Sequence, residues 1–358
     1  MDARGEPRSR TIDQLSDWAS ATLRRAAAIG DGTMAMAGLA ERAGAGGLFR
    51  LVRGVTGPLV GLVALCVFLS FSTDTFLTLR NILNVMDQIT VLGVMAVGMT
   101  LVILIGGIDL SVGSVLALSG MVLGYLGDTL HWPFGISIVI ALVVSALCGL
   151  VSGLMVTRLR MPAFIATLAM MSIARGVASI ITNGEQIVGF PDWFSYLAIT
   201  RHFGFLTVTV GLMLAIAAVA WIVLQYRPAG RALYAIGGSA EVARLAGINV
   251  RVATLWVYTL CAALAGLAGV ILSARLDSAQ PSSGIGYELD TIAAVVIGGA
   301  SLSGGLGSIG GTAAGVLIIG FLRNGLNLMG VSPFVQQVVI GLVIAIAVAA
   351  DTMRNRRA

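Results

Sequence analysis

Long apolar runs separated by short polar connections fill most of the chain after residue 54. Each run has about the 20 residues that an α-helix needs to cross a bilayer. Because a helix satisfies its own backbone polar groups within lipid, the pattern predicts an all-α, polytopic membrane protein with about ten transmembrane helices. The predicted spans are residues 55–73, 88–107, 110–127, 134–156, 162–182, 205–225, 252–272, 289–300, 308–328 and 334–350.

Composition supports this fold class. Hydrophobic residues make up 57% of the 358 residues and charged residues only 11%, whereas soluble domains carry about 25% charged residues. The 46 glycines are small enough to let apolar helices approach one another closely in a bundle.

The distribution of charge divides the chain into three regions. Residues 1–53 hold eight arginines and six acidic residues and are predicted to form a cytoplasmic tail. Within it, the stretch TIDQLSDWASATLRRAAAI fits an interfacial helix lying on the membrane, and a solvated tail is an equal alternative. Residues 54–351 form the predicted membrane domain, with a long connection at 226–251, and residues 352–358 form a second cytoplasmic tail.

Arginine positions predict the orientation in the membrane, since all 22 basic residues are arginines. If the N-terminus is cytoplasmic, 17 arginines lie inside and three, Arg80, Arg201 and Arg275, lie outside. Lysine and arginine accumulate on the cytoplasmic side of membrane proteins. The sequence therefore predicts that both termini are cytoplasmic.

The inventory of reactive side chains argues against an enzyme. Without lysine, the chain has no Walker A lysine and no Schiff-base lysine. His131 and His202 both fall in predicted connections, so we expect no zinc site. The three cysteines lie singly in apolar runs and are interpreted as small buried hydrophobes. No cofactor is expected, and any ATP that drives this protein must be bound by another chain.

One glycine-rich motif occurs twice, at corresponding positions between two spans. IGGIDLSVG at 105–113 matches IGGASLSGG at 297–305 in six of nine positions, at an offset of 192 residues. Repeated glycine-broken segments are typical of the central pathway of a transporter. Chance similarity between two small-residue stretches remains the alternative.

Asp109 lies in the first copy of this motif, at the end of an apolar run. Gly106 and Gly107 release the backbone from helical geometry, and Asp109 is then predicted to cap the helix that follows. A charged residue at membrane depth is also a candidate functional group. The second copy carries Ser301 at this position, so the two copies differ in chemistry.

Two arginines fall inside predicted spans, Arg175 and Arg323. Each could extend its side chain to the membrane interface. Alternatively, each pairs with an interior carboxylate or contacts a hydroxylated solute. The sequence leaves these alternatives open.

The connection at 226–251 combines a basic turn at Tyr226–Arg231 with a predicted short helix in EVARLAG. Ser239 is the expected N-cap and Gly247 the expected stop. Such a helix on the cytoplasmic side is typical of a docking element for a partner, and a solvated loop is the alternative.

Three stretches together resemble one family: GGIDLSVG, GRALYAIGGSAEVARLAGINV and IGGASLSGGLGSIGGTAAGVLIIGFLRNGLNLMGV. They are similar to the permease subunits of sugar-type ABC importers, the ribose, xylose, arabinose and galactose group. FLTLRNILNV and RGVASIITNGEQI add to the resemblance, which covers about residues 55–350. The chain departs from the family at Ser239, where asparagine is common, and at Val242, where alanine is frequent.

The resemblance implies a homodimeric, multi-pass permease in the cell inner membrane that moves a monosaccharide or related polyol by alternating access. It implies a periplasmic solute-binding protein and a separate ATP-binding cassette subunit as partners, together with the lipid bilayer and no nucleic acid. The ATPase would dock on 226–251, where the candidate coupling residues are Arg231, Gly237, Gly238, Glu241, Ala243, Arg244 and Gly247.

The pathway or gate would use polar and glycine residues of the broken segments and the fifth span. The candidates are Gly106, Gly107, Asp109, Ser111, Arg175, Asn183, Gly298, Gly299, Ser301 and Ser303. An ion-coupled secondary transporter is the first alternative. An ABC permease for a nucleoside, an autoinducer or a branched-chain amino acid is the second.

Overall fold

The computed structural model describes residues 57–355. The interfacial helix expected within 1–53 and the last residues of the tail at 352–358 lie outside this range. A helix over Gly57–Ser72 begins the described chain. The helices that follow are α2 (Leu79–Leu104), α3 (Val112–Gly124), α4 (Phe134–Thr157), α5 (Ala163–Ile180), α6 (Asp192–Ile199), α7 (Val208–Tyr226), α8 (Pro228–Gly238), α9 (Ala240–Leu245), α10 (Val250–Leu276), α11 (Tyr287–Ile297), α12 (Ile309–Leu328) and α13 (Pro333–Asn355).

Every predicted span contains a helix, and seven helices in the described part are long and apolar enough to cross a membrane. At 11 residues, α11 is about 16 Å long, roughly half of the 30 Å hydrocarbon core. This short helix agrees with the short apolar run at 289–300.

The bounds of α2 correct the expected span at 88–107. The helix begins at Leu79, because polar residues in its first turns have partners. Asn81 and Asn324 exchange two side-chain hydrogen bonds of 2.9 Å, and Asp87 forms an ion pair with Arg201 at 2.8 Å. Long-range partners of this kind leave no mark in the local hydrophobic pattern.

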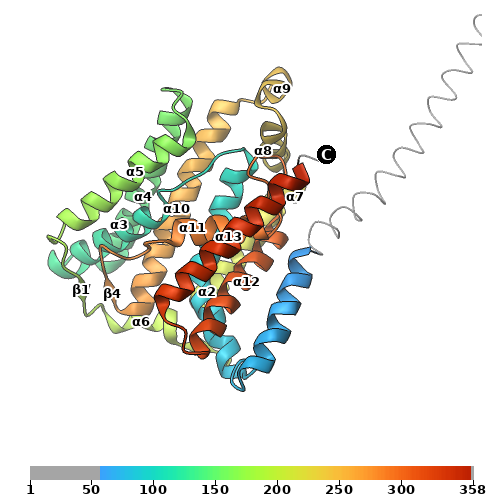
Figure 1. Cartoon of the computed structure of the whole chain (residues 1–358). Coiled ribbons are helices and arrows are strands. Elements are labelled where there is room, and N and C mark those ends of the chain that lie inside the picture. The colour runs from blue at the N-terminus through green and yellow to red at the C-terminus, as the bar shows by residue number, and fades with distance from the viewer. Residues whose placement is uncertain (1–56, 356–358) are drawn as a thin grey trace, which may run out of the picture. The chain divides into compact units, whose positions relative to one another are not determined.

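The core forms where α10 packs against α2, α3 and α4 (Figure 1). Glycines allow these helices to approach closely: a side chain at Gly149 would overlap the carbonyl of Tyr258, and one at Gly269 would overlap that of Leu116. Much of α4, α5 and α7 remains exposed in the chain, as expected of helices whose apolar faces meet lipid or another subunit.

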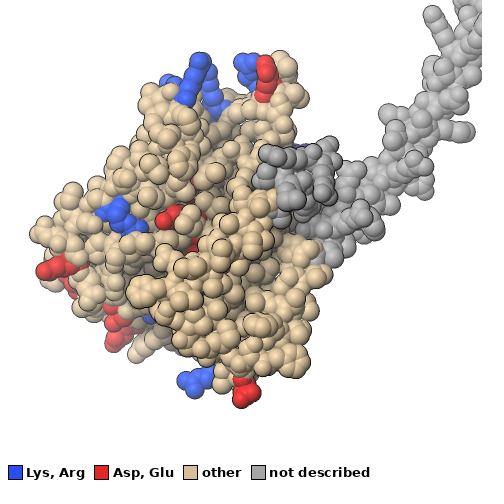
Figure 2. All heavy atoms as spheres, in the orientation of Figure 1, with Lys and Arg blue, Asp and Glu red and all other residues tan. Residues whose placement is uncertain are grey.

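One end of the bundle carries α8 and α9, which we call the α9 end. The basic turn expected at 226–231 is instead the start of α8, since Pro228 occupies the first helical turn, where proline is favoured. α9 matches the prediction: the Ser239 hydroxyl accepts the Val242 amide at 3.3 Å, and Gly247 has φ +84°. Figure 2 shows basic side chains gathered at this end. The exposed arginines bordering it are Arg158, Arg160, Arg227, Arg231, Arg244 and Arg251.

The opposite end is closed by short strands. β1 (Ile187–Val188) pairs antiparallel with β4 (Ser278–Ala279), and β2 (Arg201–His202) pairs with β3 (Leu206–Thr207). The π-helix η1 (Tyr125–Thr129) extends α3 towards this end. Between β1 and β2, α6 packs its aromatic residues against Phe134. These contacts tie the connection at 183–204 to α4 and α10.

Candidate functional site

Three glycine-rich backbone segments meet near the α9 end, a contact we call the glycine junction. It consists of Leu104–Gly106 after α2, Ser303–Gly305 after α11, and Gly237 in α8. The amide of Gly305 donates to the carbonyl of Leu104 at 2.9 Å. The two copies of the sequence motif are therefore in direct contact with each other and with α8.

Gly237 and Gly304 have no room for a side chain at this junction. A Cβ added at Gly237 would overlap the Leu104 carbonyl and the Gly305 amide, and one added at Gly304 would lie 3.0 Å from the Gly237 Cα atom. Gly106, Gly304 and Gly305 also have positive φ angles, which glycine adopts at low cost. By contrast, a Cβ at Gly238 would meet nothing within 4 Å.

Tyr234 adds a side-chain contact between α8 and the second broken segment. Its hydroxyl donates to the carbonyl of Gly307 at 2.9 Å. Burial raises the pKa of Tyr234, so the hydroxyl keeps its proton and remains a donor at neutral pH.

The two motif copies fold into the same turn despite their different residues. The amide of Ser111 donates to Oδ1 of Asp109 at 2.9 Å, and the amide of Ser303 donates to the hydroxyl oxygen of Ser301 at 3.3 Å. In each copy, a side chain accepts from the amide two residues later. This shared geometry supports a true repeat rather than chance similarity.

Asp109 differs from the cap that we expected. The N-cap of α3 is Ser111, whose side chain caps no amide of the helix. Asp109 instead stabilises the preceding turn, because Oδ1 also accepts from the Ser111 hydroxyl at 2.6 Å. Its side chain is fully buried. Within residues 57–355, neither Oδ2 of Asp109 nor the hydroxyl of Tyr258 has a partner at hydrogen-bonding geometry.

The first broken segment, or break, runs from Ile105 to Ser111 between α2 and α3. The second is longer and runs from Gly298 to Ser308 between α11 and α12. Gly298 ends α11 and lies so close to Gly311 of α12 that neither position has room for a side chain. Gly299 has φ +93°. The structure thus places Gly298 at a tight contact with α12, and Gly299 at a position that favours glycine because of its φ angle.

Arg175 and Asn183 lie away from the junction. The guanidinium of Arg175 donates to the carbonyls of Pro281 and, at 2.7 Å, Ser283, so it joins α5 to the segment before α11. Asn183 is exposed in the turn after α5 and has φ +55°.

Most of the expected coupling residues lie on the surface of the α9 end, and two, Gly237 in the glycine junction and Ala243, do not. Ala243 is buried and anchors α9, whereas Arg231, Glu241 and Arg244 are exposed. Two apolar residues of α9 that are not among the expected coupling residues are exposed: Val242 is 64% exposed and Leu245 is 78% exposed. The periodicity of a six-residue helix is too short to show which side faces outwards.

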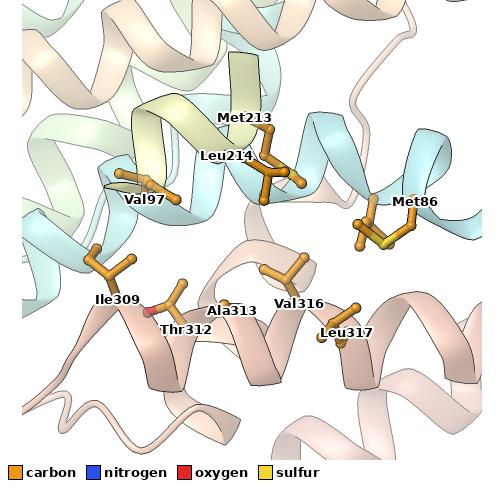
Figure 3. Close-up of a pocket in the computed structure, with 12 residues that line it drawn as sticks. Met86, Val97, Met213, Leu214, Ile309, Thr312, Ala313, Val316 and Leu317 are labelled. Carbon is orange, nitrogen blue, oxygen red and sulfur yellow. The ribbon is translucent and has the colours of Figure 1, made fainter. Parts of the chain in front are cut away.

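The crevice in Figure 3 is unsuited to a polar solute. Met86, Val97, Met213, Leu214 and Val316 are among the apolar side chains that line it. Thr312 supplies a hydroxyl, which is already hydrogen-bonded to Thr100 at 2.7 Å. In the described part of the chain, no group of His, Cys, Asp and Glu residues could hold a metal ion.

Comparison with known proteins gives consistent matches. Residues 81–348 match a family described as branched-chain amino acid transport system / permease component. The chain is 46% identical over 301 residues to the ribose import permease protein RbsC of Escherichia coli (strain K12), covering 83% of this chain and 93% of that protein. For RbsC of Bacillus subtilis (strain 168), the identity is 44% over 306 residues, covering 84% and 93%.

A more distant match is the xylose transport system permease protein XylH of Escherichia coli (strain K12). It is 33% identical over 360 residues, covering 84% of this chain and 92% of that protein. No solved structure matches the chain.

Proposed function

Because this chain belongs to the family of transport-system permease components matched over residues 81–348, we propose that it carries ribose or a closely related pentose across the bacterial inner membrane. It is the permease subunit of a sugar ABC importer, a transport subunit without an ATPase domain. The family description names branched-chain amino acids, but ribose permeases at 43–46% identity favour a pentose.

Charge supports an orientation with the α9 end in the cytoplasm, because the exposed arginines gather there. The seven long helices, together with the helix over Gly57–Ser72, α11 and α13, then make about ten membrane segments. Both termini are cytoplasmic in this arrangement.

The observation that carries the mechanism is the direct contact between α8 and both broken segments at the glycine junction. A separate ATP-binding cassette subunit docks on α8 and α9, where Val242 and Leu245 offer apolar surface among arginines. ATP is bound by that subunit, since this chain has no lysine for a Walker A motif. Closure of the ATPase moves α8, and backbone contact passes the movement to the two breaks.

The opposite end receives the solute. The connections at 183–204 and 273–288 lie there, braced by the β1–β4 pair and by Arg175. A solute-binding protein docks on these connections, and a second copy of the chain completes the pathway. Alternating access then follows from movement of the broken segments, because tightly packed elements switch between discrete arrangements rather than deform continuously.

Reconstitution tests this function. The permease is placed in proteoliposomes with its ATPase subunit and binding protein, and uptake of labelled ribose is measured. We expect uptake that requires ATP hydrolysis and resists a proton ionophore. Uptake that persists without ATP and collapses with the ion gradient contradicts the proposal and favours a secondary transporter. Transport of leucine instead of ribose favours an amino acid permease.

A further inference from the structure

The described chain has two adjoining cavities around the first turn of α11, each lined by polar and apolar groups in about equal measure. One, of about 120 Å³, is lined by Gln88, Arg275 and Tyr287. The other, of about 300 Å³, is lined by Gln336 and Gln337 of α13. Both share Asp290 of α11 and Arg323 of α12, so this ion pair forms the wall between them. We call the two cavities together the α11 pocket.

The ion pair explains why the carboxylate of Asp290 can be buried, but it does not explain why the guanidinium of Arg323 is partly exposed. Asp290 is only 4% exposed, and a buried carboxylate of this kind needs the cation that it has. The side chain of Arg323 is 43% exposed and opens onto the pocket. Because a guanidinium in contact with hydrocarbon is costly, this surface must face water, a polar solute or another polypeptide rather than lipid.

The groups in the pocket match a neutral polyhydroxylated molecule. Arg323 and Asp290 neutralise each other, and the remaining charge in the pocket, the guanidinium of Arg275, already donates to two backbone carbonyls. Sugar hydroxyls both donate and accept hydrogen bonds. The guanidinium of Arg323 supplies donors, and the amides of Gln336 and Gln337 supply both donors and acceptors.

The position of the pocket also fits a solute in transit. Asp290 lies in the first turn of α11, and Gly298 of the second broken segment ends the same helix. Movement of the glycine junction therefore acts directly on one wall of the pocket. A short helix with a hinge at one end and a cavity at the other is suited to opening and closing that cavity.

We propose that the α11 pocket binds the sugar during its passage, with Arg323, Gln336 and Gln337 as contact residues and Asp290 as the residue that positions Arg323. This inference rests on the proposed function and adds the place where the permease contacts its solute.

Transport by amide variants provides the first test. Gln336→Ala and Gln337→Ala leave the ion pair intact, and each removes about one hydrogen bond to the sugar. In the reconstituted importer, we expect the ribose transported per ATP hydrolysed to fall about three- to tenfold, while ATP hydrolysis stimulated by the loaded binding protein persists. Gln225→Ala, the same change at an exposed position near the end of α7, is the control and should leave the ratio unchanged.

Protection from labelling tests binding directly. A functional variant without native cysteines receives Gln337→Cys, and modification by a membrane-impermeant maleimide is timed with and without ribose. We expect millimolar ribose, but not leucine, to slow the modification. Unchanged labelling together with a normal transport ratio in both alanine variants would overturn the pocket assignment. If the parent importer moves ribose with ATP in the same experiments, the proposed function stands independently of that result.

Discussion

At the residue scale, alanine substitutions at two neighbouring glycines of α8, Gly237 and Gly238, distinguish close backbone contact at the junction from a general effect on helix stability. We expect Gly237→Ala to abolish most ribose uptake, because its methyl group would overlap the backbone of Leu104 and Gly305. Gly238→Ala adds the same methyl group in open space and should be neutral or slightly stabilising. Uptake and ATP hydrolysis of both variants, at matched expression in reconstituted importers, provide the measurement.

In the Gly237 variant, we expect ATP hydrolysis to continue without transport, because the ATPase still docks but its movement no longer reaches the breaks. Equal uptake by the two variants would show that close backbone contact at the junction is not required for transport.

Asp109 offers a second prediction at this scale. Asp109→Asn keeps the carbonyl oxygen that accepts from Ser111, so we expect normal assembly. Uptake should fall several-fold, because the amide nitrogen replaces the buried carboxylate oxygen beside the first break. Asp109→Ala leaves the Ser111 amide unsatisfied and should cost about 1–3 kcal/mol of stability.

Thermal denaturation of the purified permease separates the two Asp109 variants, and uptake at matched protein amounts measures the functional loss. Full uptake by Asp109→Asn would show that the carboxylate only stabilises the turn and is not required for transport.

Residues whose role depends on neighbours in sequence were the easiest to predict. The Ser239 cap and the Gly247 stop both act within one helical turn, and the structure has both. Asp290 and Arg323 are 33 residues apart, and Asn81 and Asn324 are 243 apart. Nothing local shows that such residues meet, so the α11 pocket could not be located from the sequence.

At the element scale, α9 is the surface on which the ATPase proposal depends. We expect Leu245→Asp to weaken co-purification of the ATPase subunit about tenfold or more, because a charge replaces an apolar side chain that is buried on docking. Leu245 is 78% exposed in the chain, so the change should leave the thermal stability of the permease unaltered. Co-purification of the ATPase at fixed salt gives the measurement.

Phe203→Ser is the matched control for this surface. Phe203 is 90% exposed at the opposite end, and its loss should not affect the ATPase. A Leu245→Asp variant that binds the ATPase normally would place the docking surface elsewhere than on α9.

The elements themselves were predicted where apolar length alone decides the structure. All ten apolar runs contain helices, because a long apolar run within lipid has few alternatives to a helix. The start of α8 was missed, since Pro228 and Gly230 favour a turn on local grounds. Packing decides the matter: a side chain at Gly230 would overlap the backbone of Leu224, so glycine is needed for α8 to fold back on α7.

At the scale of the whole molecule, one continuous set of contacts joins the two ends of the bundle. α9 and α8 form the arginine-rich surface, α8 touches both breaks, and the second break continues into α11 with its pocket. The chain therefore needs no long relay of side chains between the docking surface and the solute. A shift of α8 displaces the end of an 11-residue helix whose other end lines the pocket.

This set of contacts can transmit movement from the ATPase to the pocket only if the α9 end faces the ATP-containing side of the membrane. In a functional variant without native cysteines, expressed without the ATPase subunit, Leu245→Cys should react with an impermeant maleimide only after the membrane is permeabilised. Phe203→Cys, at the opposite end, should react in intact right-side-out vesicles. Leu245 and Phe203 are both exposed on the protein surface, so a difference in labelling reports the side of the membrane and not burial within the protein. Rapid labelling of Leu245→Cys in intact vesicles would put α8 and α9 outside, where no ATPase could reach them, and the proposed coupling would fail.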